Sequence, residues 1–276
     1  MENVIYRYEK SLLTGILHRR YKRFLADVEI LSGTGDITVV HCPNSGSMLN
    51  MAPPHVTLPK CIVSLSDNPK NKYQHGLEMI QLNSTWVGIN SALANKMVKC
   101  ALEKNLIPEV AGFVKFNQEV KVGDSRIDFE LLFEDDVTVS DAALTSRPLK
   151  KQRRNNAELN RAPNSNRMLL EVKSVTLTYP ERSDVAEFPD AVSLRATKHA
   201  NVLKNYAAQG GRAAIFFLIQ RSDVLSFSPC SIDKKYQLAL HEAHAAGVLI
   251  LPYKCELCPE TKTVILLEKV PYINSL

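Results

Sequence analysis

RIDFELL, at residues 126–132, and LLEVKSV, at residues 169–175, both read as β-strands that carry acidic side chains within apolar runs. Asp128 lies in the first strand. Glu171 and Lys173 lie two residues apart in the second, so both side chains project from one face. Acids in such strands are costly unless they are paired or bind a metal. The two strands therefore mark a candidate functional site.

The residue types at this site favour divalent metal chemistry. An Asp on one strand and Glu-x-Lys on the next, after a helix, match the PD-(D/E)xK nuclease pattern. Mg²⁺ prefers oxygen ligands, so Asp128, Glu171 and the Val172 backbone carbonyl are candidate ligands for Mg²⁺ or Mn²⁺. Lys173 is a candidate to orient or help deprotonate the attacking water, or to stabilise charge on the phosphate. Glu119, on the preceding strand, is a candidate further ligand.

A purely structural interpretation is a buried ion pair, either Glu171 with Lys173 or Asp128 with Arg126. The order of helices and strands around the motif favours the metal site instead. We therefore take Asp128, Glu171 and Lys173 as the predicted catalytic residues.

The sequence around these strands alternates between helical and strand periodicity, in the order α-β-β-β-α-β-α-β-β. Helices are predicted at 91–105, 193–209 and 234–246, where Pro108, Gly210-Gly211 and Gly247 end them. This pattern predicts an α/β domain.

The first part of the chain has a different pattern, with short strands, Gly- and Pro-containing loops and no strong helix. Strand-like runs at 19–31 and 37–42 flank a turn, and another run covers 76–90. We predict two domains: a small β-barrel over residues 1–88 and an α/β domain over residues 89–276.

The net charge of +5 for 276 residues is concentrated in one segment. Residues 147–167 hold seven basic side chains against one acid, so the rest of the chain is close to neutral. The polar stretch from about 134 to 167 is predicted to be a disordered insertion, because it has too little apolar surface to offset its ordering entropy. Its KKQRR cluster, 150–154, fits a nuclear-import signal, an auxiliary nucleic-acid contact, or a solvated loop without a partner.

Composition argues against membrane and secreted classes. The longest apolar run, residues 213–219, is far shorter than the ~20 residues that span a bilayer. The first residues lack the apolar stretch of a secretory signal, and six cysteines in a chain of this length do not suggest a disulfide framework. We expect a cytoplasmic protein with reduced thiols and no membrane partner; nuclear localisation would follow if the KKQRR cluster acts as an import signal.

A family resemblance is carried by separate stretches in fixed order: RFLADV (23–28), HCPNSGSM (41–48), VGIN (87–90), GDSRIDF (123–129), EVKSVTL (171–177), FPDA (188–191) and the helix with Arg195, Lys198 and His199. By these stretches the chain resembles the sugar fermentation stimulation protein A family over nearly its whole length, the 134–167 insertion excepted. The resemblance implies an N-terminal OB-like barrel followed by a PD-(D/E)xK nuclease-like domain. It also implies DNA binding, a link to sugar metabolism and, through the motif, a metal-dependent nuclease.

Two features depart from the family pattern. The loop before the EVK strand is longer than is usual in the family, at the entrance of the predicted site. Ala196 and Ala200 stand where Gly and Leu are expected, which affects the packing of that helix.

Candidate nucleic-acid contacts gather at two places. An OB-like barrel offers a groove for DNA, single-stranded DNA included, and residues 18–24 supply basic side chains with interleaved aromatics. Strand alternation points half of these side chains away from any ligand. The predicted contacts are Arg19, Arg20, Lys22, Arg23, Arg126, Arg195, Lys198 and His199, with Asp190 and Gln220 as further residues of the cleft. Residues 195, 198 and 199 share one helical face. The HCPNSGSM loop has backbone amides that could meet a phosphate or shape a turn.

Cys255 and Cys258 form a CxxC pair without a second pair, and His241 and His244 lack the spacing of a metalloprotease site. These four residues would form a zinc site only if the fold brought them together.

Three hypotheses follow from the sequence. The first is a DNA-binding protein with a Mg²⁺-dependent nuclease-like site that hydrolyses phosphodiester bonds. The second is a non-catalytic DNA-binding transcriptional regulator of sugar metabolism genes. The third is a zinc-stabilised interaction protein.

Overall fold

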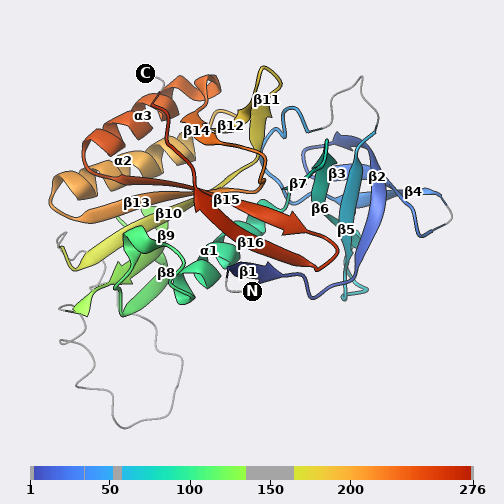
Figure 1. Ribbon diagram of the computed structural model, residues 1–276, viewed down its shortest axis with the longest axis horizontal. Coiled ribbons are helices and arrows are strands. Elements are labelled where there is room, and N and C mark those ends of the chain that lie inside the picture. Colours follow the sequence, from blue (N-terminus) through green and yellow to red (C-terminus); the bar gives the residue numbers. More distant parts are fainter. Residues whose placement is uncertain (1–2, 34, 52–57, 135–164, 275–276) are drawn as a thin grey trace, which may run out of the picture.

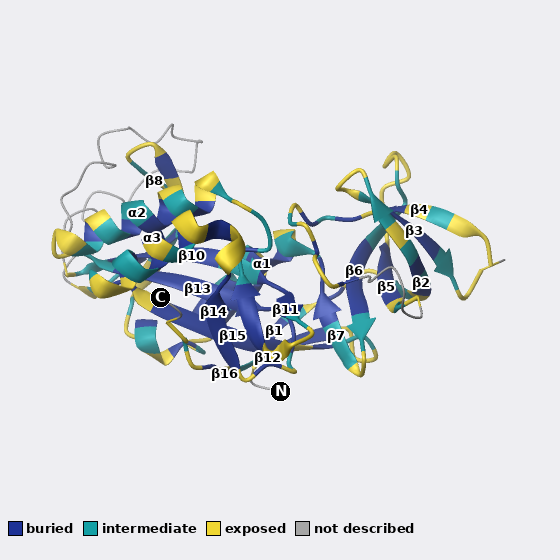
Figure 2. Ribbon diagram, turned by 90° about the horizontal axis from the view of Figure 1, so that it is seen from above, coloured by how far each residue is buried: buried dark blue, intermediate teal, exposed yellow. Residues whose placement is uncertain are grey.

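A computed structural model describes residues 3–33, 35–51, 58–134 and 165–274. A β-barrel and a larger α/β domain lie side by side (Figure 1). Figure 2 shows that buried segments fill the centre of the larger domain, beneath its helices. The predicted fold class, a mixed α/β chain with an N-terminal barrel, is confirmed.

The barrel is built from strands in the order β4-β3-β2-β5-β6-β7, and an additional pairing of β4 with β6 at His41–Gly76 brings its ends together. Its strands are β2 (Leu12–Tyr21), β3 (Leu25–Ile30), β4 (Ile37–His41), β5 (Lys60–Leu65), β6 (His75–Leu82) and β7 (Thr85–Gly88). The predicted strand at 19–31 is split, because Lys22 and Arg23 take positive φ values of 46° and 64° and turn the chain.

The larger domain is organised around a sheet whose described strands run in the order β1-β16-β15-β13-β10-β9-β8. Its strands are β1 (Val4–Arg7), β8 (Lys115–Val122), β9 (Ser125–Leu132), β10 (Arg167–Val175), β13 (Arg212–Ile219), β15 (Leu249–Cys258) and β16 (Thr263–Lys269). Strands β10, β13 and β15 are parallel to one another, and the outer pairs are antiparallel.

Helices cover both faces of this sheet. Helix α1 (Ala94–Glu103) packs on one face, and α2 (Leu194–Ala208) and α3 (Lys234–Ala245) pack together on the other. Short 3₁₀ helices precede or follow these elements at Ser91–Leu93, Pro108–Val110 and Ser231–Asp233. The parallel strands are therefore buried on both sides, as their almost continuous apolar sequences require.

A small second sheet, which the sequence pattern did not reveal, lies beside the carboxyl end of β10. It consists of β11 (Leu177–Tyr179), β12 (Arg182–Phe188) and β14 (Ser226–Pro229), in that order. The strand predicted at 169–175 lies within β10, and after Thr176 the chain passes from the large sheet into this second sheet.

Strand β1 does not join the barrel. The predicted division places residues 1–88 in the barrel domain, but β1 pairs antiparallel with β16 in the large sheet. Its Ile5 is 1% exposed and packs in the same core as α1. The chain therefore begins in the larger domain and then enters the barrel.

The predicted insertion lies mostly outside the described residues, including the KKQRR cluster. Arg167, which the predicted insertion includes, is the first residue of β10, and its guanidinium pairs with Glu130. The Asn166 carbonyl accepts a hydrogen bond from Phe133 N at 2.9 Å, so the chain just after β9 is bonded to the chain just before β10. Within the described residues, no helix combines the length and the apolar character that crossing a membrane requires.

Replacing Ile5 by Ala tests whether β1 is part of the core of the larger domain. Loss of a buried Ile side chain should lower the free energy of unfolding by about 2–5 kcal/mol. The control is Ile37→Ala, because Ile37 is 56% exposed and its loss should change stability by less than about 0.5 kcal/mol. Equal unfolding midpoints for the two variants in urea would contradict the placement of β1.

Candidate metal centre and its cleft

Asp128 and Glu171 face each other where two strands of the sheet separate. The β9–β10 register runs from Leu132–Arg167 to Phe129–Leu170, and the next pair would be Asp128 with Glu171. Two carboxylates directly opposite each other repel. The ladder ends there, and the Asp128 side chain accepts the Val172 N–H at 2.8 Å instead. The divergence of the strands is thus a local consequence of the two acids.

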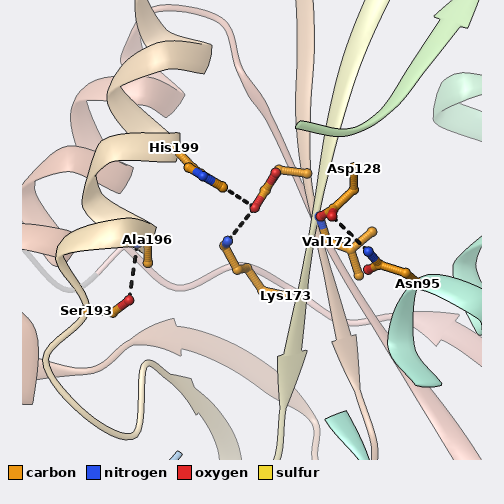
Figure 3. A network of polar contacts seen from close by, with 8 residues as sticks. Asn95, Asp128, Val172, Lys173, Ser193, Ala196 and His199 are labelled. Carbon is orange, nitrogen blue, oxygen red and sulfur yellow. Dashed lines mark hydrogen bonds and ion pairs between the residues drawn. The ribbon is translucent and has the colours of Figure 1, made fainter. Parts of the chain in front are cut away.

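Asp128 is held by a second donor from another element. Asn95 of α1 donates its amide to Asp128 Oδ1 at 2.7 Å (Figure 3). Burial, and then the charge of Glu171, raise the pKa of Asp128 above its ordinary value. Asn95 was not predicted from the sequence. The available signal was an amide beside the apolar face of the helix, because buried polar groups require partners.

Glu171 is 2% exposed and is held through one of its two oxygens. Lys173 Nζ donates to Oε1 at 2.6 Å, and His199 Nδ1 donates to the same oxygen at 2.5 Å. Burial alone raises the pKa of Glu171, but the His199 hydrogen bond and the charge of Lys173 outweigh it and bring this pKa below its usual value. Oε2 has no hydrogen-bond partner among the described residues. The carboxylate is thus fixed and ionised, with one oxygen not engaged.

Helix α2 brings His199 to this position. Ser193 caps the helix by accepting the Ala196 N–H at 3.1 Å (Figure 3). The Ser193 N–H donates in turn to Asp233, which also caps α3 by accepting from Tyr236 N. His199 is 4% exposed and lies against Glu171. We therefore reassign it from predicted nucleic-acid contact to a residue that positions Glu171.

The donor set fits a hard divalent cation. It comprises Glu171 Oε2, which has no hydrogen-bond partner among the described residues, and the backbone of Val172. It also includes the Asp128 carboxylate, whose charged form is disfavoured by the charge of Glu171. The described residues contain no group of three His, Cys, Asp or Glu side chains suited to a metal. A cation here would therefore depend on two carboxylates, the Val172 carbonyl and water.

Both structural alternatives from the sequence can be compared with these contacts. The Glu171–Lys173 pair exists, at 2.6 Å. Arg126, however, pairs with Glu119 at 3.3 Å on an exposed surface and not with Asp128. Glu119 has a positive φ of 56°, and it does not line the cleft that contains Asp128. The structure thus does not bring Glu119 to the metal centre.

A cleft of about 390 Å³ surrounds the centre and takes its walls from both domains. Asp128, Glu171 and Lys173 line it from the large sheet, and Arg195 lines it from α2. From the barrel side, the cleft is lined by Arg23 and residues 44–46. The metal centre therefore opens onto the boundary between the domains.

The basic stretch 18–24 mainly supports the loop at 41–48. The Arg20 guanidinium donates to the carbonyls of Asn44, Gly46 and Ser47 at 2.8–2.9 Å. Arg23 donates to Ser45 O at 2.9 Å but stays exposed at the cleft.

Arg19 pairs with Asp27 at 2.7 Å, and Lys22 is exposed in the turn. Of the predicted barrel contacts, Arg20 is thus committed to shaping the loop, whereas Arg23 remains available at the cleft.

Asp190 joins the loop to the larger domain. Its carboxylate accepts the Met48 N–H at 3.0 Å, and its carbonyl accepts the Ser47 hydroxyl at 2.5 Å. A Cβ at Gly46 would lie 2.2 Å from Asp190 Oδ2, so a larger residue there would displace this carboxylate. Asp190 therefore lines the cleft as predicted and also connects the two domains.

The remaining predicted residues lie at other positions. Gln220 is 1% exposed, and its side-chain amide donates to Ser174 Oγ at 2.7 Å. Its backbone carbonyl accepts from Gly88 N at 2.9 Å, so Gln220 joins the end of the barrel to the sheet. Lys198 is exposed and donates to Asp124 O at 3.2 Å.

The CxxC pair shows no metal cluster. Cys255 is fully buried, whereas Cys258 is partly exposed and donates to Glu260. Consistent with this, the described part of the chain offers no three-ligand His/Cys/Asp/Glu group. The zinc hypothesis thus gains no support from the structure.

Gly46→Ala tests the contact between the loop and Asp190. The added methyl group must displace the carboxylate, and such overpacking should cost about 1–3 kcal/mol of stability. Gly33→Ala is the control, because its nearest contact would be 3.4 Å. Combining Gly46→Ala with Asp190→Ala removes the clash, so the double variant should be less destabilised than the sum of the single variants in thermal unfolding. Strict additivity would contradict the contact.

Comparisons with known proteins agree with this architecture. The family description "SfsA N-terminal OB domain" matches residues 19–89, and "Sugar fermentation stimulation protein RE domain" matches residues 92–140 and 147–261.

A sugar fermentation stimulation protein homolog of Shewanella baltica is 38% identical over 91% of this chain and 94% of its own length. One of Trichodesmium erythraeum is 37% identical over 92% and 89%, respectively. The solved structure of Pyrococcus furiosus SfsA in complex with Ca²⁺ shares the fold, with a TM-score of 0.74 and 22% identity over 98% of this chain and 99% of that one. The chain belongs to the sugar fermentation stimulation protein family.

Proposed function

We propose that this protein is a metal-dependent nuclease that hydrolyses phosphodiester bonds of DNA in the cleft between its domains. The observation that carries the proposal is the buried Glu171 carboxylate beside Asp128. It is fixed through Oε1, whereas Oε2 has no hydrogen-bond partner in the part of the chain that the structure describes. Placing a half-buried carboxylate beside a buried one is costly, and a bound cation would offset that cost.

The related Pyrococcus furiosus protein, described in complex with Ca²⁺, supports a divalent cation in this fold. We propose Mg²⁺ or Mn²⁺ as the catalytic cation here, held by Asp128, Glu171 and the Val172 carbonyl. Such a cation supplies Lewis-acid stabilisation of a phosphate oxygen and acidifies a water molecule.

The side chains of the centre have separate roles in this proposal. Lys173, which lines the cleft 2.6 Å from Glu171 Oε1, places a positive charge where the attacking water and the developing phosphate charge would lie. His199 donates a hydrogen bond to Glu171 Oε1 and fixes the orientation of this carboxylate. Asn95 and the Val172 N–H fix Asp128 in the same way. Such supporting contacts hold ligands in the geometry that a cation requires.

Basic residues at the mouth of the cleft support DNA as the substrate. Arg195 and Arg23 line the cleft from opposite domains, and Arg23 donates to a neutral partner, the Ser45 carbonyl. A phosphate backbone lying between them would be neutralised from both sides. The barrel adds the kind of surface that binds single-stranded nucleic acid in other proteins of this architecture.

Incubation with plasmid and single-stranded DNA in Mg²⁺ or Mn²⁺ tests the activity. Wild type should cleave DNA, Asp128→Ala should be inactive, and Lys173→Ala should be slower by about 10²–10³-fold. The pair Lys204–Glu242, 2.7 Å apart on the outer helices, is a matched Lys–Glu pair outside the cleft. Lys204→Ala and Glu242→Gln should therefore keep full activity.

Intact DNA with wild type in both metals would contradict the nuclease proposal. If that DNA were nevertheless bound with a strong salt dependence that Asp128→Ala preserves, the second hypothesis, a non-catalytic DNA-binding regulator, would replace it.

Cation binding can be measured without DNA. At a Ca²⁺ concentration of about 100 times its Kd, the folded protein should gain about 2.7 kcal/mol, seen as a higher unfolding temperature in scanning calorimetry. Asp128→Ala and Glu171→Gln should lose this gain because each removes a ligand, whereas Glu242→Gln should keep it. An equal shift in all of these proteins would place the cation elsewhere.

A further inference from the structure

A second pocket, of about 190 Å³, lies on the barrel. We call it the barrel pocket. It is lined by residues of β4, β5 and β6 and of the segments next to them, and it shares no lining residue with the metal cleft. Its volume is below the usual range for drug-sized ligands, so it suits a small planar group of the size of a nucleobase.

The most deeply buried ionisable group of the barrel pocket is Glu78, which is 7% exposed. Its Oε1 accepts from Ser64 Oγ at 2.7 Å, and its Oε2 accepts from Asn90 Nδ2 at 2.9 Å. Each carboxylate oxygen has two lone pairs, so each can accept one further hydrogen bond. Burial raises the pKa of Glu78 above its ordinary value, although the hydrogen bonds from Asn90 and Ser64 act in the opposite direction. The pocket therefore favours a ligand that donates hydrogen bonds.

Other side chains add stacking surface and one donor. The rings of His41, Tyr73 and His75 line the barrel pocket, and His75 Nδ1 and Asn90 Oδ1 have no hydrogen-bond partner within the described residues. Lys10 also lines it, close enough for its charge to lower the pKa of Glu78. Aromatic rings around a polar centre are typical of sites that stack and read a nucleobase.

The barrel pocket adjoins the metal cleft across a thin wall. Pro43 and Asn90 line the pocket, whereas the residues that follow them, Asn44 and Ser91, line the cleft. The wall is fixed by two hydrogen bonds from Ser91, N–H and hydroxyl, to Pro43 O, both at 3.2 Å. A DNA strand with a phosphate in the cleft would therefore have a neighbouring base beside the barrel pocket.

We propose that the barrel pocket binds one guanine base of the strand whose phosphate lies in the metal cleft. The inference rests on the proposed function, since it requires single-stranded DNA in the cleft. It adds a specificity site in which Glu78 accepts from the guanine ring N–H and amino group, and Lys10 donates to the guanine O6.

Guanine suits these groups better than the other bases do. Its edge offers two adjacent donors and an acceptor, which complement a carboxylate beside a lysine. Thymine lacks an amino group, and adenine and cytosine pair their amino donor with a ring acceptor that a carboxylate would repel.

Fluorescence anisotropy with labelled oligothymidylates that carry one central guanine, hypoxanthine or adenine tests this site, in Ca²⁺ and again in EDTA. Hypoxanthine differs from guanine only by lacking the amino group. Wild type should bind the guanine oligonucleotide about tenfold more tightly than either of the others. Glu78→Gln should reduce that ratio to about one. If Glu78→Gln acted only by removing a negative charge, it would instead tighten the binding of all three oligonucleotides.

Glu29→Gln is the matched control, because Glu29 is a barrel carboxylate paired with His18 at 3.2 Å and does not line the pocket. It should keep the tenfold preference. Should Glu78→Gln fail to fold, Tyr73→Leu can be used instead. It removes the stacking surface and should weaken binding of the guanine oligonucleotide about tenfold.

Equal wild-type affinity for guanine and hypoxanthine, or a guanine preference that survives Glu78→Gln, would overturn this inference while leaving the nuclease proposal intact. Absence of any oligonucleotide binding would overturn both the inference and the DNA part of the proposed function. Cleavage of DNA without base preference would overturn only the inference.

Discussion

Two carboxylates that face each other across adjacent strands, the buried Glu171 and the half-buried Asp128, are the constraint on which the larger domain depends. The β9–β10 ladder ends where Asp128 would meet Glu171, because like charges at that position repel. Each acid is then held from another element: Asn95 of α1 donates to Asp128, and His199 of α2 donates to Glu171. Helices on opposite faces of the sheet thus each donate a hydrogen bond to one of these two acids. Loss of Asn95 or His199 alone would leave the charge of the acid that it contacts less compensated. This is more costly than replacing donor and acid together.

The same centre depends on the barrel. Asp190 connects the loop at 41–48 to the larger domain, and Gln220 contacts Gly88 at the end of the barrel. Strand β1 begins in the large sheet before the chain enters the barrel, so the two domains are connected at both ends of the barrel segment. A cleft with walls from both domains is fixed by these contacts. The position of DNA, in the function proposed here, would therefore be set by the barrel and its chemistry by the sheet.

Local patterns were sufficient to predict the fold class and to single out Asp128, Glu171 and Lys173, because alternation along a strand is a local property. Contacts between distant segments were not predictable in this way. Helical spacing showed that Arg195, Lys198 and His199 share a face, but not that His199 is buried against Glu171. Composition suggested that Arg20 contacts DNA, whereas its guanidinium is occupied by carbonyls of a loop more than twenty residues away. The role of Glu78 was not predictable because its partners, Ser64 on β5 and Asn90 just after β7, are more than ten residues away in the sequence.

A crystal structure with bound Mn²⁺ would show whether Asp128 and Glu171 together hold one divalent cation. The anomalous scattering of manganese locates the ion independently of the protein atoms. We expect an anomalous peak in the cleft within bonding distance of both Asp128 and Glu171 Oε2, with Lys173 and His199 still hydrogen-bonded to Oε1. A peak at Glu119 or elsewhere, or no peak at a saturating Mn²⁺ concentration, would contradict it.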